Sequence, residues 1–214
     1  MKGDVSYKLR DRALAAADSD IVATLRSCCG LEIDGISDLV NTRAPYPEAY
    51  PALIGLLERD YPIRMREMIV RALTVPDAHD VAYEPILRLY RASDTAFPKS
   101  TVGYESYAYA LANALSVLAR KADRRTLLDL ARDPRYGPSR TAFVNAMRRW
   151  KDPDADVFII EALNDADIAY AAIEAAATRH LHCALARIAE LEQSSNKEIA
   201  RAAKRAGKKL ANRT

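Results

Sequence analysis

A polar side chain beside alanine recurs at nearly constant intervals along the chain, each time within a stretch of helical periodicity. The intervals are 42, 32, 29 and 30 residues, and they separate Arg71, Asn113, Asn145, Glu174 and Lys204. A period of about 30 residues is typical of stacked units that cannot bury their apolar faces alone. This repeat therefore constrains the fold to an array of similar units.

An apolar cluster followed by a turn residue precedes most of these positions. The run at 53–57 leads to Asp60, for example, and the run at 127–131 leads to Asp133. Each unit is thus predicted to be a pair of helices, since the period-two alternation of strands is absent. One pair is too small to be stable, so the pairs must stack. The prediction is an all-α fold, an α-solenoid of stacked antiparallel helical hairpins. We expect helices at 4–17, 19–28, 35–41, 47–59, 62–74, 80–92, 105–120, 123–132, 139–150, 155–163, 167–180, 183–193 and 197–211.

Composition excludes several classes of protein for this chain of 214 residues. Half of the residues are hydrophobic, which excludes a wholly disordered chain. A net charge of +3 is too small to argue by itself for nucleic acid or a membrane surface. No apolar run approaches the roughly 18 residues that a membrane span needs, so we expect no membrane partner. Three Cys cannot form a disulfide framework and Met1–Arg10 has no signal-peptide core, which favours a cytoplasmic location.

The paired pattern resembles the HEAT-repeat family, in particular its short PBS-lyase-like repeats. The resemblance rests on Pro-Ile-Leu at 85–87 in a first helix and Ile-Val-Arg-Ala-Leu at 69–73 in a second helix. The stretch at 38–43, before Tyr-Pro-Glu-Ala at 46–49, is similar to one in uncharacterised bacterial HEAT proteins. The resemblance implies a single α/α superhelix over 1–214. Residues 1–46 would form an N-terminal cap, and 47–211 would form about five repeats.

In HEAT-like solenoids the second helices line the concave side, and the resemblance implies the same here. Residues three or four positions from each recurring polar residue share its helix face. Tyr109 and Tyr170 then occupy the same offset in different repeats. Asn can donate to and accept from a peptide backbone at once, and Tyr is a common interface anchor. The predicted concave-face residues are Arg71, Tyr109, Asn113, Arg120, Asn145, Arg149, Tyr170, Glu174 and Lys204. Alternatively, these residues tie neighbouring repeats together or face water.

The longest connection between expected helices covers 93–103 and contains Phe97 beside Pro98. Long loops in compact folds are often binding loops. A disordered insertion is the other interpretation of this segment.

Positive charge is concentrated in the segment 120–152. It has ten basic and four acidic residues, whereas the following segment, 153–196, has two basic and eight acidic residues. Such a segment could bind phosphates by releasing counterions from nucleic acid. It could equally be a solvated face attracted to the acidic repeat that follows.

We identify no catalytic residues, no cofactor-binding residues and no metal ligands. A glycine-rich phosphate loop and a nucleophile elbow are both absent. His180, His182 and Cys183 are close in sequence, but positions two apart point in different directions on a helix. We interpret them as a helix terminus and a turn. The adjacent Cys28 and Cys29 are interpreted as buried thiols rather than a redox pair.

The function that these observations favour is a non-enzymatic adaptor that binds a protein or peptide on its concave face. An immunity-type inhibitor of a bacterial toxin would be a specialised version. The alternative is a nucleic-acid binder that uses 120–152, or a DNA-repair glycosylase, because some alkylpurine glycosylases resemble this architecture. Those enzymes use aromatic side chains and a carboxylate in a basic cleft, and Trp150 lies close to Asp152 and Asp154. A chromophore lyase role, after which the short repeats are named, is a further alternative.

Overall fold

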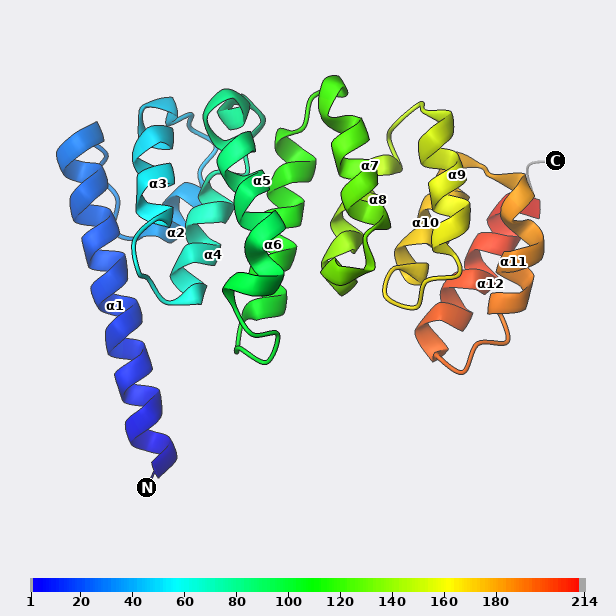
Figure 1. Cartoon of the computed structure of the whole chain (residues 1–214), viewed down its shortest axis with the longest axis horizontal. Helices are drawn as coiled ribbons and strands as arrows, with labels where there is room; N and C mark the ends of the chain where they lie inside the picture. The colour runs from blue at the N-terminus through cyan, green and yellow to red at the C-terminus, as the bar shows by residue number, and fades with distance from the viewer. Residues whose placement is uncertain (1, 212–214) are drawn as a thin grey trace. The chain divides into compact units, whose positions relative to one another are not determined.

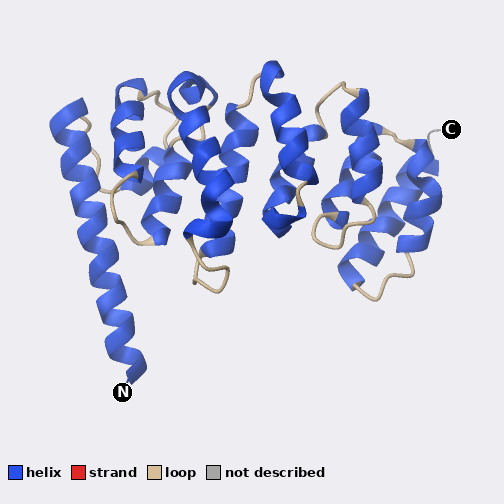
Figure 2. Ribbon diagram, viewed as in Figure 1, coloured by secondary structure: helices blue, strands red, loops and turns tan. Residues whose placement is uncertain are grey.

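The computed structural model describes residues 2–211, with the side chains of 11–93 and 95–211. Between residues 2 and 211 the chain forms twelve α-helices joined by short 3₁₀ helices and loops, without any strand (Figure 2). The predicted all-α class is therefore confirmed for this part of the chain. Within the same range, no helix combines the length and the apolar composition that a membrane span requires.

The chain divides into two compact units, Met1–Arg120 and Lys121–Thr214. The helices of the first unit are α1 Lys2–Cys29, α2 Ile36–Asn41, α3 Tyr50–Leu57, α4 Ile63–Ala72, α5 His79–Ala96 and α6 Tyr104–Leu118. Those of the second unit are α7 Arg124–Arg132, α8 Thr141–Met147, α9 Pro153–Ala162, α10 Ala169–Arg179, α11 Leu185–Leu191 and α12 Lys197–Ala211. From α3 onward, these positions match the five predicted helix pairs.

The helices of each predicted pair pack against one another inside their unit. In the first unit α3 packs on α4 and α5 on α6, while the second helices α4 and α6 also contact each other (Figure 1). Leu53, Ile69, Ile86 and Leu111, one from each of these four helices, are completely buried. Because neighbouring pairs share this core, each pair gains the apolar contacts that it could not supply alone.

Residues 2–29 form one continuous helix, so the predicted break between 4–17 and 19–28 is wrong. The polar residues at the predicted break serve other elements instead of capping a new helix. The Asp18 carboxylate accepts a hydrogen bond from the backbone N–H of Ile36 (2.9 Å), and Asp20 accepts one from Arg59 (2.7 Å). No Gly or Pro lies there to end the helix. The first half of α1 runs past the ends of α3 and α4 (Figure 1).

The long connection before α6 is anchored through Phe97. Helix α5 continues to Ala96, four residues beyond the predicted end. The Phe97 ring meets Tyr107 edge-on at 5.8 Å between ring centroids, and the Arg66 guanidinium lies 5.8 Å from the Phe97 centroid. The aromatic side chain that made this loop a candidate binding element is therefore engaged within its own unit.

In the second unit α7 packs on α8, α9 on α10 and α11 on α12. The helix predicted at 139–150 is shorter than expected. A 3₁₀ helix, Pro134–Arg140, precedes α8, because Gly137 has a left-handed φ of 51° and Pro138 follows it. The middle second helix, α10, contacts both α8 and α12. Three second helices thus lie in succession within this unit.

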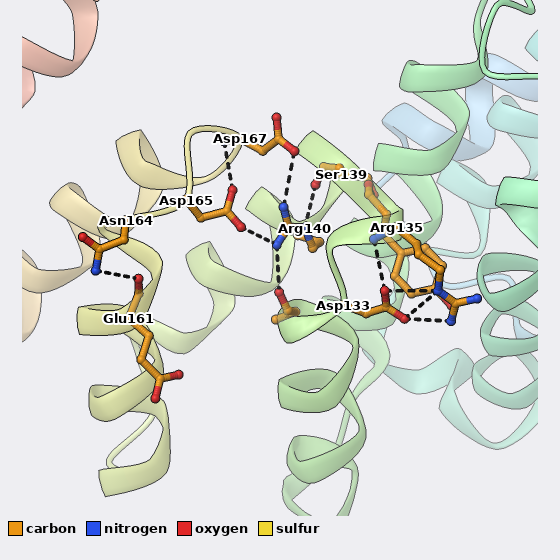
Figure 3. Close-up of polar contacts among 11 residues, drawn as sticks. Asp133, Arg135, Ser139, Arg140, Glu161, Asn164, Asp165 and Asp167 are labelled. Atoms are coloured by element: carbon orange, nitrogen blue, oxygen red, sulfur yellow. Dashed lines mark hydrogen bonds and ion pairs between the residues drawn. The ribbon is translucent and has the colours of Figure 1, made fainter. Parts of the chain in front are cut away.

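Arg140 joins consecutive helix pairs of this unit (Figure 3). Its side chain is only 2% exposed, and its guanidinium donates to Asp165 (2.7 Å) and Asp167 (3.3 Å) in the turn between α9 and α10. Its Nε also donates to the carbonyl of Gly137 (2.9 Å). A buried cation with this many acceptors holds the pair α7–α8 in register with the pair α9–α10.

Candidate functional site

The second unit has an open pocket of about 460 Å³ on its three second helices. Each of α8, α10 and α12 contributes to it, at or beside the positions singled out by the repeat. We call it the second-helix pocket, and it is lined by Thr141, Asn145, Arg148, Tyr170, Ala171, Glu174 and Arg205.

Alanine-rich faces explain why these polar side chains converge. Helix α10 buries Ala172, Ala175 and Ala176, and α12 buries Ala202 and Ala203, each completely. Small side chains allow helix axes to approach closely, because few atoms separate the backbones. Tyr170 and Glu174 on α10 and Arg205 on α12 stand beside these alanines, exposed or half-buried, and line the same pocket together with Ala171.

Two side chains of the second-helix pocket are available to a ligand. Asn145 is half-buried, and its amide makes no hydrogen bond with another residue between 2 and 211. Tyr170 is 46% exposed. The pocket therefore offers an amide that can both donate and accept, beside an aromatic surface.

The charged side chains of the pocket come from all three helices. Arg205 donates to the Glu174 carboxylate at 3.0 Å. The pKa of Arg205 is raised, first by this hydrogen bond and then by one with the Tyr170 hydroxyl. Arg148 donates instead to the neutral Thr178 hydroxyl at 3.1 Å, so its charge is not neutralised there. The pocket is positive overall, with two guanidinium groups and one carboxylate.

The structure brings together three of the predicted residues, namely Asn145, Tyr170 and Glu174. Lys204 is exposed on α12 but does not line the pocket, whereas its neighbour Arg205 does. The 30-residue interval therefore gives the position next to the cation that lines this pocket. Arg149 is exposed just beyond the end of α8, outside the pocket lining.

The predicted residues of the first unit have different surroundings. Arg71 forms an ion pair with Glu67 at 2.8 Å, so it stabilises its own helix. Tyr109, which is 40% exposed, and the half-buried Asn113 both lie on α6. Arg120 follows the end of α6 and pairs with Asp80 at 2.7 Å, near the start of α5. The helix stops at Leu118, so the expected extension of its face to residue 120 is wrong.

Most arginines of the basic segment 120–152 have carboxylate partners within the chain. The ion pairs are Arg120–Asp80, Arg125–Asp129, Arg132–Glu161, Arg135–Asp133 and Arg140–Asp165. Two of the partners, Glu161 and Asp165, belong to the acidic repeat that follows. Attraction between these consecutive repeats, one of the two interpretations of the segment, is thus present in the structure.

A second pocket, of about 270 Å³, lies where the basic segment meets the start of α9, and its lining also includes Asp152 and Asp154. Lys121, Arg124 and Lys151 line it, and none of them pairs with a carboxylate in the part of the chain that the structure describes. The Arg124 guanidinium lies 5.2 Å from the centroid of the Trp150 ring, and Trp150 is 9% exposed. The indole is therefore covered, not presented to a ligand.

The cysteines and histidines show no metal-binding arrangement in residues 2–211, where no group of three or more His, Cys, Asp or Glu could hold an ion. Cys28 is exposed and Cys29 half-buried, so the prediction of two buried thiols is wrong, because both lie at the exposed end of α1. Burial raises the pKa of Cys29 to about 11, and a hydrogen bond with Cys28 adds to the effect. His180 closes α10 with a φ of 57°.

No protein-family model, curated protein or solved structure matches the chain. The resemblance to HEAT repeats therefore stays a prediction. Any functional conclusion depends on the geometry of the pockets.

Proposed function

We propose that the chain is a non-enzymatic adaptor that binds a segment of another protein in the second-helix pocket. One observation carries this proposal. Asn145, Tyr170 and Glu174, selected as a binding face from their spacing and from the resemblance to HEAT repeats, line one open pocket. The same pocket also contains contacts between neighbouring second helices, Arg205 to Glu174 and Arg148 to Thr178, whereas the Asn145 amide makes no hydrogen bond within residues 2–211.

We also propose that the helix pairs form a HEAT-type solenoid with second helices on its concave side. The packing of α4 on α6, and of α10 on both α8 and α12, supports this arrangement within each unit. A concave face of consecutive second helices would extend the pocket into a longer binding surface. A cytoplasmic location remains part of the same proposal.

A peptide suits the chemistry of the pocket better than a nucleic acid. The Asn145 amide can bond both the N–H and the C=O of an extended backbone. Tyr170 can pack against an apolar side chain. Most arginines of the basic segment already have carboxylate partners, so few of its charges are left to neutralise phosphates.

Nucleic-acid binding is the second candidate. It is favoured by one observation, the gathering of Lys121, Arg124 and Lys151 around Trp150. A stacked base would have to displace Arg124 from the indole face. The experiment that tests the adaptor proposal should therefore distinguish the two surfaces.

The test is an affinity pull-down from native lysate with the whole chain, with and without nuclease. The double variant Asn145→Ala/Tyr170→Ala removes the amide and the aromatic surface. The control Asn164→Ala/Val157→Ala removes an exposed amide and an exposed apolar side chain elsewhere in the same unit.

A protein that survives nuclease, is lost with the first variant and is kept by the control would support the adaptor proposal. Circular dichroism should be unchanged in both variants. Capture that depends on nucleic acid, or that both variants retain, would contradict it.

A further inference from the structure

We infer that the partner segment bound in the second-helix pocket is acidic; this inference rests on the proposed function. The lining itself holds Arg148 and Arg205 against Glu174. Because Glu174 already accepts from Arg205, the remaining guanidinium donors are available to a ligand carboxylate.

Helix α12 extends the positive charge beyond the pocket. Arg201, Lys208 and Lys209 stand four residues before and three and four residues after Arg205, which places them on the same helix face. All three are exposed. None forms an ion pair with a carboxylate of the described chain. The face around the pocket thus has five cations, against Glu174 in the pocket and Glu198, which stands seven residues before Arg205 on the same face of α12.

Helix electrostatics explains only part of this charge. Lys208 and Lys209 lie in the last turn of α12, where the helix dipole favours cations. Arg201 lies in the N-terminal half, where the dipole gives a cation no such benefit. A complementary partner charge would stabilise it, and would also accelerate association.

The occupant that fits is a protein segment with Asp or Glu side chains flanking an apolar residue. Its carboxylates would meet Arg148 at the C-terminal end of α8 and Arg201 or Arg205 on α12, while its apolar residue covers Tyr170 on the helix between them. A nucleic-acid strand has phosphates at every step, and one of them would lie beside Glu174. The pattern of charge therefore selects carboxylates over a phosphate backbone.

The experiment is a display selection on the whole chain of random peptides of about 12 residues, a peptide length that spans a helical groove. A counter-selection on Asn145→Ala/Tyr170→Ala removes peptides that do not need the pocket. Enrichment of Asp and Glu among the pocket-dependent peptides is expected. Pocket-dependent peptides that are neutral or basic would overturn the inference and leave the proposed function intact. Absence of pocket-dependent peptides would contradict the proposed function itself.

Charge variants then test the electrostatic contribution to the affinity of a selected peptide. The variant Arg148→Gln/Arg201→Gln/Lys208→Gln should lose affinity by about tenfold or more at low salt, with less loss as salt screens the charges. The control Lys121→Gln/Arg125→Gln/Lys151→Gln removes the same charge around the other pocket and should stay within about twofold. Equal losses would overturn the inference. Displacement of the peptide by an unstructured oligonucleotide of equal charge at equal or lower concentration would do so too.

Discussion

Alanine is the residue that makes the second-helix pocket possible. Ala172, Ala175 and Ala176 on α10, with Ala202 and Ala203 on α12, are completely buried. The polar neighbours of these alanines line the pocket. Substituting the alanines would separate the helices, while substituting Asn145 or Tyr170 would leave the helices in place. The residues that build the pocket are thus distinct from those proposed to bind.

The reactivity of Cys29 follows from its surroundings. Burial, and then the hydrogen bond with Cys28, raises the pKa of Cys29 to about 11, so the thiol is largely protonated at neutral pH. We predict alkylation by iodoacetamide at least about tenfold slower than for free cysteine at pH 8. The rate should keep rising with pH to about 11. Mass spectrometry of the fragmented peptide measures it, and a rate that levels off by about pH 9 would be incompatible with this environment.

Asp133 provides a test of pH dependence. Hydrogen bonds from Arg135 lower the pKa of Asp133 in the folded state, so its contribution is present above the unfolded pKa of about 3.9 and is lost as pH falls through the lower folded value. Asp133→Asn keeps a side-chain oxygen that can accept from the backbone N–H of Arg135, and it removes the charge. The free energy of unfolding should fall by up to about 1 kcal/mol at pH 7, since Arg135 is exposed.

This difference should shrink as the pH falls below about 4, because the carboxylate is then protonated first in the unfolded state and, below its lowered pKa, in the folded state as well. Urea denaturation of both proteins at pH 7 and at about pH 3 measures it. A difference that grows towards low pH would contradict the sign of the shift.

At the scale of the elements, one buried arginine holds two helix pairs in register. Arg140 donates to Asp165, Asp167 and the Gly137 carbonyl. Lysine cannot reach these separate acceptors with a single ammonium group. We predict that Arg140→Lys lowers the free energy of unfolding by about 2 to 4 kcal/mol. Arg135→Lys, at an exposed ion pair, should cost less than about 1 kcal/mol. Equal costs in thermal or urea unfolding would refute the role of Arg140.

The most specific prediction about the second-helix pocket concerns two residues of helix α12. Repeat spacing selects Lys204, and the structure selects Arg205. Arg205→Gln should weaken binding of a pocket-dependent peptide by about tenfold, since a positive charge of the pocket lining is lost. Lys204→Gln changes the same helix by the same charge and should stay within about twofold. Calorimetric titration decides between them, and a larger loss at Lys204 would support the repeat spacing over the structure.

Periodicity was sufficient to predict the five helix pairs and the convergence of Asn145, Tyr170 and Glu174. Periodicity did not predict the helix ends and side-chain positions that depend on contacts with residues far away in the sequence. The polar residues at 18–20 bind Ile36 and Arg59 instead of ending a helix, which no local pattern reveals. Arg120 is drawn to Asp80 in the same way. The choice of Arg205 over Lys204 depends on the rotation of α12 against α10, which a repeat interval does not determine.

At the scale of the whole molecule, the two candidate functions differ in the surface on which a partner binds. Both candidate surfaces belong to the second unit, the second-helix pocket on α8, α10 and α12 and the basic pocket around Trp150. The adaptor proposal requires the first surface, and the nucleic-acid alternative requires the second. Because the two pockets have different lining residues in the same unit, one nuclear magnetic resonance spectrum can report on both of them.

The most direct measurement is an ¹⁵N–¹H nuclear magnetic resonance titration of the whole chain with a pocket-dependent peptide or the captured partner segment. The chain has one Trp, so its indole N–H gives a single signal for the basic pocket. The side-chain amide of Asn145 reports on the second-helix pocket. The account predicts that the Asn145 signals shift and saturate while the Trp150 signal stays in place. A shift of the Trp150 indole with unchanged Asn145 signals would contradict it.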